Sequence, residues 1–126
     1  MTFLLDTNIV IAVLNKETAV ERQLVGKTIF LGTIILGELY YGARKSARSK
    51  ENLAKIETLV AGYPLLDCTK QTAEQYGPLK NELETKGRLI PENDLWIAAL
   101  AKQHSLTLVT RDEHFKRVDG LQVESW

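Results

Sequence analysis

Residues 3–14 read FLLDTNIVIAVL, in which a short polar segment beginning at Asp6 separates two apolar runs. The run within Thr2–Leu5 predicts a short strand, and the second run predicts a helix over Asn8–Leu14 that is apolar nearly all round and therefore buried. An ionised carboxylate between two buried elements is costly unless it is paired, hydrogen-bonded or bound to a metal. The rest of the sequence must therefore supply a partner for Asp6.

The remainder of the chain alternates between predicted helices and predicted strands. In chain order, its apolar spacing favours a helix at 19–25, a strand at 28–31, a helix at 34–45, a helix ending at Gly62, a strand at 65–68, a helix at 69–87, a helix at 94–103, a strand at 106–109 and a candidate edge strand at 120–126. Because Gly77-Pro78 lies inside the helix at 69–87, we expect a kink or a break there.

Strands that are joined through helices need crossover connections, which favour parallel pairing with helices packed on the sheet. We therefore predict an α/β fold with a mostly parallel central sheet of four to five strands and helices on both faces. No repeat, linker or low-complexity segment interrupts the pattern, so we expect a single domain over residues 1–126.

Composition narrows the class of protein. The chain carries 16 Lys plus Arg against 16 Asp plus Glu, and this zero net charge argues against a nucleic-acid binder that relies on charge alone. It leaves open an enzyme that holds a phosphate through metal ions. The single Cys68 cannot form an internal disulfide, which suits a reducing cytoplasm. Asp6 interrupts the apolar start and the other apolar runs are short, so we expect neither a signal peptide nor a membrane segment.

Two acids follow predicted strands directly. Asp6 comes after FLL, and Asp112 follows TLVT by one residue. In open parallel sheets, ligands bind at the carboxyl ends of the strands, near a switch in strand order. An Asp after a strand also commonly caps the next helix or forms an Asx-turn, so both interpretations stay open for each residue.

Glu38 and Asp94 lie on predicted helices. At helical spacing, Glu38 has only uncharged neighbours, so no ion pair within its helix explains this carboxylate, and it lies either at an edge or at a site. Asp94 is near a helix start, where capping is the ordinary explanation. Asn93 could cap instead, however, and Asp94 shares a helical face with Ile97 and Ala98, which should point inward.

The chemistry of these acids depends on whether they meet. Four carboxylates within a few ångström of one another repel by about 4 kcal/mol per pair at an effective dielectric of 20, unless a cation neutralises them. Oxygen ligands favour Mg²⁺ or Mn²⁺, and no Cys/His cluster indicates zinc. An acidic pocket holding such ions is suited to the hydrolysis of phosphodiesters.

Four blocks of the sequence resemble, in order, the PIN-domain ribonucleases, and specifically the VapC-like toxins of type II VapBC toxin–antitoxin systems. They are LLDTNIVI (4–11), GELYYGA (37–43), ENDLWIAALA (92–101) and LVTRDEHFKRVDGLQVESW (108–126). The resemblance implies a three-layer PIN-like fold and a metal-dependent endoribonuclease that uses Mg²⁺ or Mn²⁺. It implies that an acidic quartet binds the metal, made up of Asp6, Glu38, Asp94 and Asp112, and that Asn8 and Thr110 orient the carboxylates or a bound water.

The resemblance also implies partners. A VapB-like antitoxin should block the site, and operator DNA should be bound only through that antitoxin. The apolar first helix and the leucine-rich middle of the chain indicate subunit and antitoxin contacts, so we expect a homodimer. Arg111, Lys116 and Arg117 lie beside Asp112 and are placed to meet an RNA phosphate. His104 and His114 are not expected to be ligands; His114 is interpreted as lining the groove.

Two alternatives remain. A haloacid-dehalogenase-like phosphohydrolase also places an Asp after its first strand, but it needs a second Asp two residues later, where this chain has Asn8. A catalytically silent PIN-fold partner would act only through complexes with antitoxin and DNA. The presence of all four acids argues against the silent alternative.

Overall fold

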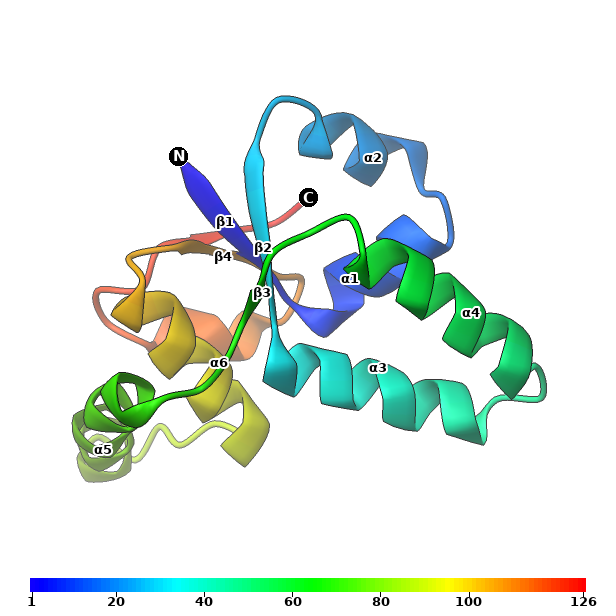
Figure 1. Cartoon of the computed structure of the whole chain (residues 1–126). Coiled ribbons are helices and arrows are strands. Elements are labelled where there is room, and N and C mark those ends of the chain that lie inside the picture. The colour runs from blue at the N-terminus through cyan, green and yellow to red at the C-terminus, as the bar shows by residue number, and fades with distance from the viewer.

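The computed structural model describes residues 1–126 as a layered arrangement of five strands, six α-helices and one short 3₁₀ helix (Figure 1). In chain order the elements are β1 (Thr2–Leu5), α1 (Thr7–Leu14), α2 (Thr18–Leu24), β2 (Thr28–Gly32), α3 (Thr33–Lys45), α4 (Ser49–Val60), β3 (Leu65–Leu66), α5 (Lys70–Thr85), α6 (Glu92–Gln103), β4 (Thr107–Val109), η1 (Glu113–Arg117) and β5 (Val123–Glu124).

The five strands form one sheet in the order β3-β2-β1-β4-β5, and every neighbouring pair is parallel. In this register Leu5 of β1 lies opposite Val109 of β4. The α/β class and the parallel sheet are confirmed, and the candidate edge strand at 120–126 is confirmed as β5. The chain moves outward from β1 through β2 to β3, and then crosses back to β4 on the other side of β1. The switch point of the sheet, where the direction of strand order reverses, therefore lies between the paired strands β1 and β4.

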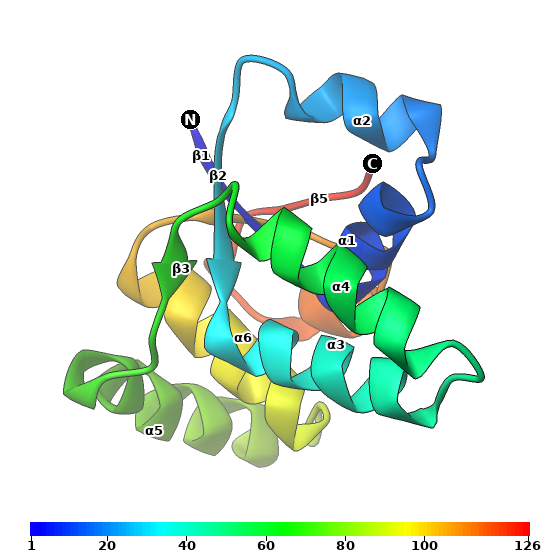
Figure 2. The ribbon, with the colours of Figure 1, turned by 45° about the vertical axis from the view of Figure 1, so that its right-hand side comes forward.

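Helices cover both faces of the sheet. The first four helices lie together on one side, and α5 and α6 pack against each other on the opposite side (Figures 1 and 2). Right-handed crossovers account for this division, because the connections to β2 and β3 advance in one direction and the connection to β4 returns in the other.

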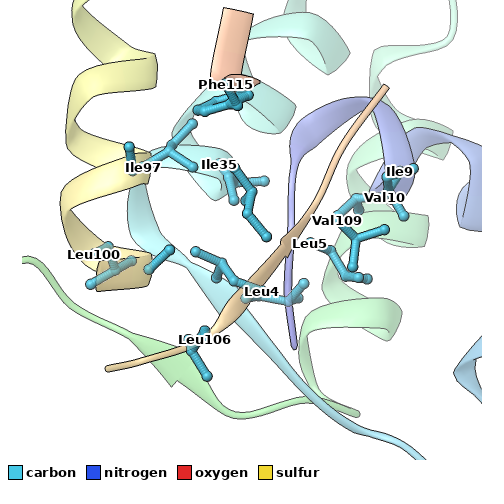
Figure 3. Packing of buried hydrophobic residues seen from close by; sticks show 14 of the residues in the cluster. Leu4, Leu5, Ile9, Val10, Ile35, Ile97, Leu100, Leu106, Val109 and Phe115 are labelled. Atoms are coloured by element: carbon cyan, nitrogen blue, oxygen red, sulfur yellow. The ribbon is translucent and has the colours of Figure 1, made fainter. Parts of the chain in front are cut away.

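A continuous cluster of 27 buried hydrophobic residues fills the space between the layers. Leu4, Ile35, Ile97 and Phe115 meet in its interior (Figure 3). Gly32 at the end of β2 allows α6 to approach closely, because a Cβ atom there would lie 2.9 Å from Leu100 Cδ2. The single-domain organisation stays a prediction, with which this one cluster agrees.

The expectation of a buried first helix was wrong, and of the kink or break expected at Gly77-Pro78 the break is excluded. Helix α1 is not buried all round, because Ile9, Val10 and Ala12 are buried whereas Ile11 is 45% exposed. Helix α5 does not break at Gly77-Pro78, and it runs without interruption from Lys70 to Thr85. Pro78 is exposed, while Leu79 and Leu83 on the buried face hold the helix against the core. None of the helices combines the length and the apolar character needed to cross a lipid bilayer.

Candidate active site

The switch point between β1 and β4 brings Asp6 and Thr110 together. Asp6 N donates to Val109 O at 2.9 Å, which continues the pairing of the two strands to their carboxyl ends. The Thr110 hydroxyl donates to Asp6 Oδ2 at 2.7 Å, although the two residues are 104 positions apart in the chain. Both side chains are buried, so this contact fixes the first acid at the place where parallel sheets bind ligands.

Asp6 also caps helix α1, because its Oδ1 accepts from Thr7 N at 2.8 Å. The capping interpretation therefore holds for this residue, and its position fits the site interpretation, which stays a prediction. Burial raises the pKa of the Asp6 carboxyl, while the hydrogen bonds from Thr110 and Thr7 lower it and the negative charges of Glu38 and Asp112 raise it.

Asn8 and Thr110 join the segments that follow the two strands. Asn8 Nδ2 lies 3.3 Å from Asp6 Oδ2, and Asn8 Oδ1 accepts from Arg111 N at 3.1 Å. Thr110 Oγ1 accepts from Asp112 N at 3.0 Å while donating to Asp6. This geometry fits the orienting role that we expected for both residues, which stays a prediction.

Glu38 reaches the site from the second turn of α3. Its Oε2 accepts from Thr7 Oγ1 at 2.8 Å, and its Oε1 lies 3.4 Å from Asn93 Nδ2. No Lys or Arg forms an ion pair with Glu38, in agreement with its uncharged helical neighbours. The sequence interpretation missed Thr7, which stands between Asp6 and Asn8, and considered Asn93 only as a cap.

Asp94 lies in the first turn of α6 but does not cap it, since the helix begins at Glu92 after Pro91. Its side chain is 15% exposed, and Ile97 and Ala98 on the same face are fully buried, so the inward orientation expected for this acid is confirmed.

The four acids lie near one another through shared contacts, and their charges act on the pKa of Asp94. Burial, and then the negative charges of Asp6, Asp112 and Glu38, raise the pKa of Asp94 to about 6, against an opposing effect of His114. All three of the other acids are thus close enough to disfavour a charge on Asp94. Such clustering is the usual mark of a functional carboxylate site, and a divalent cation would relieve the repulsion.

Asp112 precedes the 3₁₀ helix η1 and caps it, with Oδ1 accepting from His114 N at 2.9 Å. The ring of His114 also lies beside two of the acids, with Nδ1 at 3.1 Å from Asp112 Oδ1 and at 3.6 Å from Asp94 Oδ2. One donor atom from each of these three residues falls within 4.8 Å of the others, a spacing that could hold a metal ion. Two carboxylate oxygens and one imidazole nitrogen are donor atoms that can bind a divalent cation.

The match to a known family agrees with this geometry. The PIN domain family model matches residues 3–121. The chain belongs to the PIN-domain family.

Relatives of this PIN domain match along the whole chain. Ribonuclease VapC2 of Rickettsia felis is 36% identical, with 100% of this chain and 98% of the relative covered. Ribonuclease VapC2 of Haemophilus influenzae is 39% identical with the same coverage. The tRNA(fMet)-specific endonuclease VapC of Shigella flexneri is 35% identical, also over 100% of this chain and 98% of the relative.

Solved structures agree with the fold. VapBC2 from Rickettsia felis, bound to a DNA fragment from the promoter, contains a chain with a TM-score of 0.93 and 35% identity that covers 100% of this PIN domain and 99% of that chain. A chain of DNA-bound VapBC from Salmonella typhimurium has a TM-score of 0.94 and 32% identity, and the match covers 100% of this PIN domain and 98% of that chain. The predicted PIN-like three-layer fold is thereby confirmed.

The basic side chains near Asp112 each have a partner inside this PIN domain. Arg111 donates to Glu17 Oε1 at 3.1 Å and Trp126 O at 3.2 Å, Lys116 donates to Glu113 Oε2 at 2.7 Å, and Arg117 donates to Leu89 O at 3.0 Å. All three side chains are exposed, and their contact with an RNA phosphate stays a prediction.

A groove of about 260 Å³ runs between α1, α3 and α4 and adjoins the acidic site of the PIN domain. Ile11 and Leu14 form one apolar wall, Leu39 and Ile56 belong to the facing helices, and Glu38 lines the groove as well. The face of α1 that was expected to be buried thus borders an open apolar groove beside a candidate metal ligand.

Proposed function

We propose that this protein is a metal-dependent endoribonuclease and the toxin of a VapBC-type toxin–antitoxin pair. In this proposal Asp6, Glu38, Asp94 and Asp112 bind Mg²⁺ or Mn²⁺. The observation that carries it is the convergence of these four carboxylates at the switch point of a parallel sheet, where burial and then the charges of the other three acids raise the pKa of Asp94 to about 6. Curated relatives that match the whole chain are named as VapC ribonucleases.

The residues of the chain set up the site before a substrate arrives. A divalent cation held there would activate water and stabilise the negative charge that develops on a phosphodiester. Thr110 and Asn8 hold the Asp6 carboxylate, and Thr7 holds Glu38, so the ligand oxygens need little reorganisation. The fixed carboxylates therefore define where a cation, and hence the scissile phosphate, is positioned.

The competing activities are less well supported. A haloacid-dehalogenase-like mechanism needs an ionisable acid two residues after Asp6, but the Asn8 amide there cannot ionise and its two ends are bound to Asp6 and to the Arg111 backbone. A catalytically silent partner would have no need to bury repelling carboxylates, since burial of unneutralised charge costs free energy.

We propose that the partners are RNA as substrate, a second copy of the chain, and a VapB-like antitoxin through which operator DNA is bound. Relatives were solved as VapBC assemblies on DNA. The groove beside Glu38 is the surface we assign to an antitoxin segment, because its apolar wall around Ile11 leads directly to the acids that must be blocked. The lone Cys68 and an RNA substrate suit action in the cytoplasm.

The activity is tested with protein purified free of antitoxin and incubated with total RNA, including initiator tRNA. We expect cleavage with Mg²⁺ or Mn²⁺, none in excess EDTA, and a loss of roughly 100-fold or more in Asp6→Asn and Asp94→Asn. Glu84→Gln, an exposed acid on α5, is the matched control and should cleave normally. Full cleavage in EDTA would rule out the metal mechanism.

A further inference from the structure

His114 has a fixed position on the wall of the acidic site. It lies in the tight turn of η1, its backbone N–H is bound to Asp112 Oδ1 at 2.9 Å, and the adjacent Phe115 is fully buried in the core. A residue anchored by its own backbone and by its neighbour has little freedom to move its ring away. The contacts of the imidazole therefore belong to the folded site.

One nitrogen of this ring has no hydrogen-bond partner within the chain. Nδ1 is buried and lies 3.1 Å from Asp112 Oδ1 and 3.6 Å from Asp94 Oδ2, but it makes no hydrogen bond of acceptable geometry to either oxygen. A buried polar atom without a partner is uncommon, because leaving it unpaired costs free energy. Here the unpartnered atom faces two carboxylates that already need a cation.

The separations of these atoms are those of ligands around one ion. With metal–ligand bonds of about 2.1 Å, neighbouring ligands of an octahedral ion lie about 3 Å apart and opposite ligands about 4.2 Å apart. The two distances from Nδ1 are 3.1 and 3.6 Å, and all three donor atoms lie within 4.8 Å of one another. These separations are compatible with three donors around a common cation.

We infer that Nδ1 of His114 is a ligand of the divalent cation bound by Asp94 and Asp112; this inference rests on the metal site of the proposed function. A neutral imidazole offers a lone pair at Nδ1 when its proton is on Nε2, toward the exposed edge of the ring. A nitrogen donor suits Mn²⁺ better than Mg²⁺, which prefers oxygen. The site is therefore tuned toward Mn²⁺ by a residue outside the acidic quartet.

Electron spin-echo spectroscopy of the Mn²⁺-loaded protein tests the inference directly. The chain has two histidines, so an untagged preparation allows an unambiguous assignment of any coordinated imidazole nitrogen. We expect nitrogen modulation in the wild type, its loss in both His114→Gln and His114→Ala, and its retention in His104→Gln. His104 is exposed at the end of α6 and serves as the matched control.

Metal titration of the same variants shows whether a negative result concerns the His114 ligand alone or the whole metal site. His114→Ala should weaken Mn²⁺ binding about tenfold and Mg²⁺ binding by about threefold or less, with an unchanged circular dichroism spectrum. Bound Mn²⁺ without coordinated nitrogen in the wild type, or nitrogen modulation that persists in the His114 variants, overturns the inference alone. Absence of any Mn²⁺ binding by the wild type overturns the metal site and with it the proposed function.

Discussion

Three donors converge on the carboxylate of Asp6, and the residue still lies among negative charges. Thr7 N, Thr110 Oγ1 and Asn8 Nδ2 surround its two oxygens, while Glu38 and Asp112 repel it. A carboxylate held in this way is ready to bind a cation, because the donors fix its orientation without neutralising its charge. The same side chain caps the start of α1, so a structural role is combined with the metal-binding role that we propose for it.

Asp94 should make the stability of the metal-free protein depend on pH. Its pKa is raised to about 6 in the folded chain, against a value near 4 when unfolded, so the unfolded state releases its proton first. The free energy of unfolding should therefore fall as the pH rises from about 4 to about 6 and stay lower above that range. Asp94→Asn should be more stable than the wild type by roughly 1 kcal/mol at about pH 8, allowing for partial solvent screening.

Urea unfolding in EDTA measures this difference. The advantage of Asp94→Asn should vanish near pH 4, where the wild-type carboxyl is protonated in both states. Asp67→Asn, which changes an exposed Asp outside the site, should show no such dependence. An equal advantage at both pH values would mean that charge at Asp94 is not what destabilises the folded protein.

Glu38→Gln separates catalysis from folding. The glutamine keeps the shape of the side chain and an oxygen that can accept from Thr7, but it cannot supply a charged ligand. We expect a melting temperature without metal within about 2 °C of the wild type or higher, and a loss of cleavage of roughly 100-fold or more. A large fall in melting temperature, seen by calorimetry in EDTA, would instead assign Glu38 a structural role.

At the scale of elements, local sequence predicted which segments form helices and strands but not all the contacts between them. Asp6 and Asp112 could be placed at strand ends from their neighbours alone. Thr7 and Asn93 could not be assigned to Glu38, because that contact requires α1, α3 and α6 to close on one another. His114 was set aside for a similar reason, since only the 3₁₀ turn of η1 brings its ring back toward Asp112.

Helix α5 offers a test of backbone conformation within one element. Gly77 is helical, and a Cβ atom there would meet nothing within 4 Å, so Gly77→Ala should stabilise the protein by about 0.5–1 kcal/mol. Gly87, just beyond the helix, has a φ of +65°, where an alanine is strained. Gly87→Ala should therefore destabilise by about 1 kcal/mol, and opposite shifts of the urea midpoint would verify both expectations.

At the scale of the whole molecule, the order of strands could not be read from local patterns. Alternating helices and strands were enough for a parallel α/β sheet, and the acids at strand ends were enough to suspect a site. The convergence of four carboxylates depends on β1 lying between β2 and β4. That order is set by packing over the whole core, and only the resemblance to a known family implied it from the sequence.

A substitution in the groove between α1, α3 and α4 should separate inhibition by the antitoxin from cleavage of RNA. Ile11→Glu places a charge on its exposed apolar wall, and should leave RNA cleavage intact while weakening inhibition by the antitoxin about tenfold or more. Val25→Glu is the matched control, because Val25 is 79% exposed and does not line the groove. Titration of cleavage with purified antitoxin measures the effect, and unaltered inhibition of Ile11→Glu would place the antitoxin elsewhere.

The central position of β1 has a consequence for synthesis. This strand is translated early, yet its partner β4 and the contact between Asp6 and Thr110 wait for a segment 104 positions later. A nascent chain that has not reached Asp112 lacks one of the four acids of the proposed metal site and the Thr110 contact to Asp6. The proposed site is therefore completed only when the segment that carries β4 and Asp112 has been synthesised and has packed beside β1.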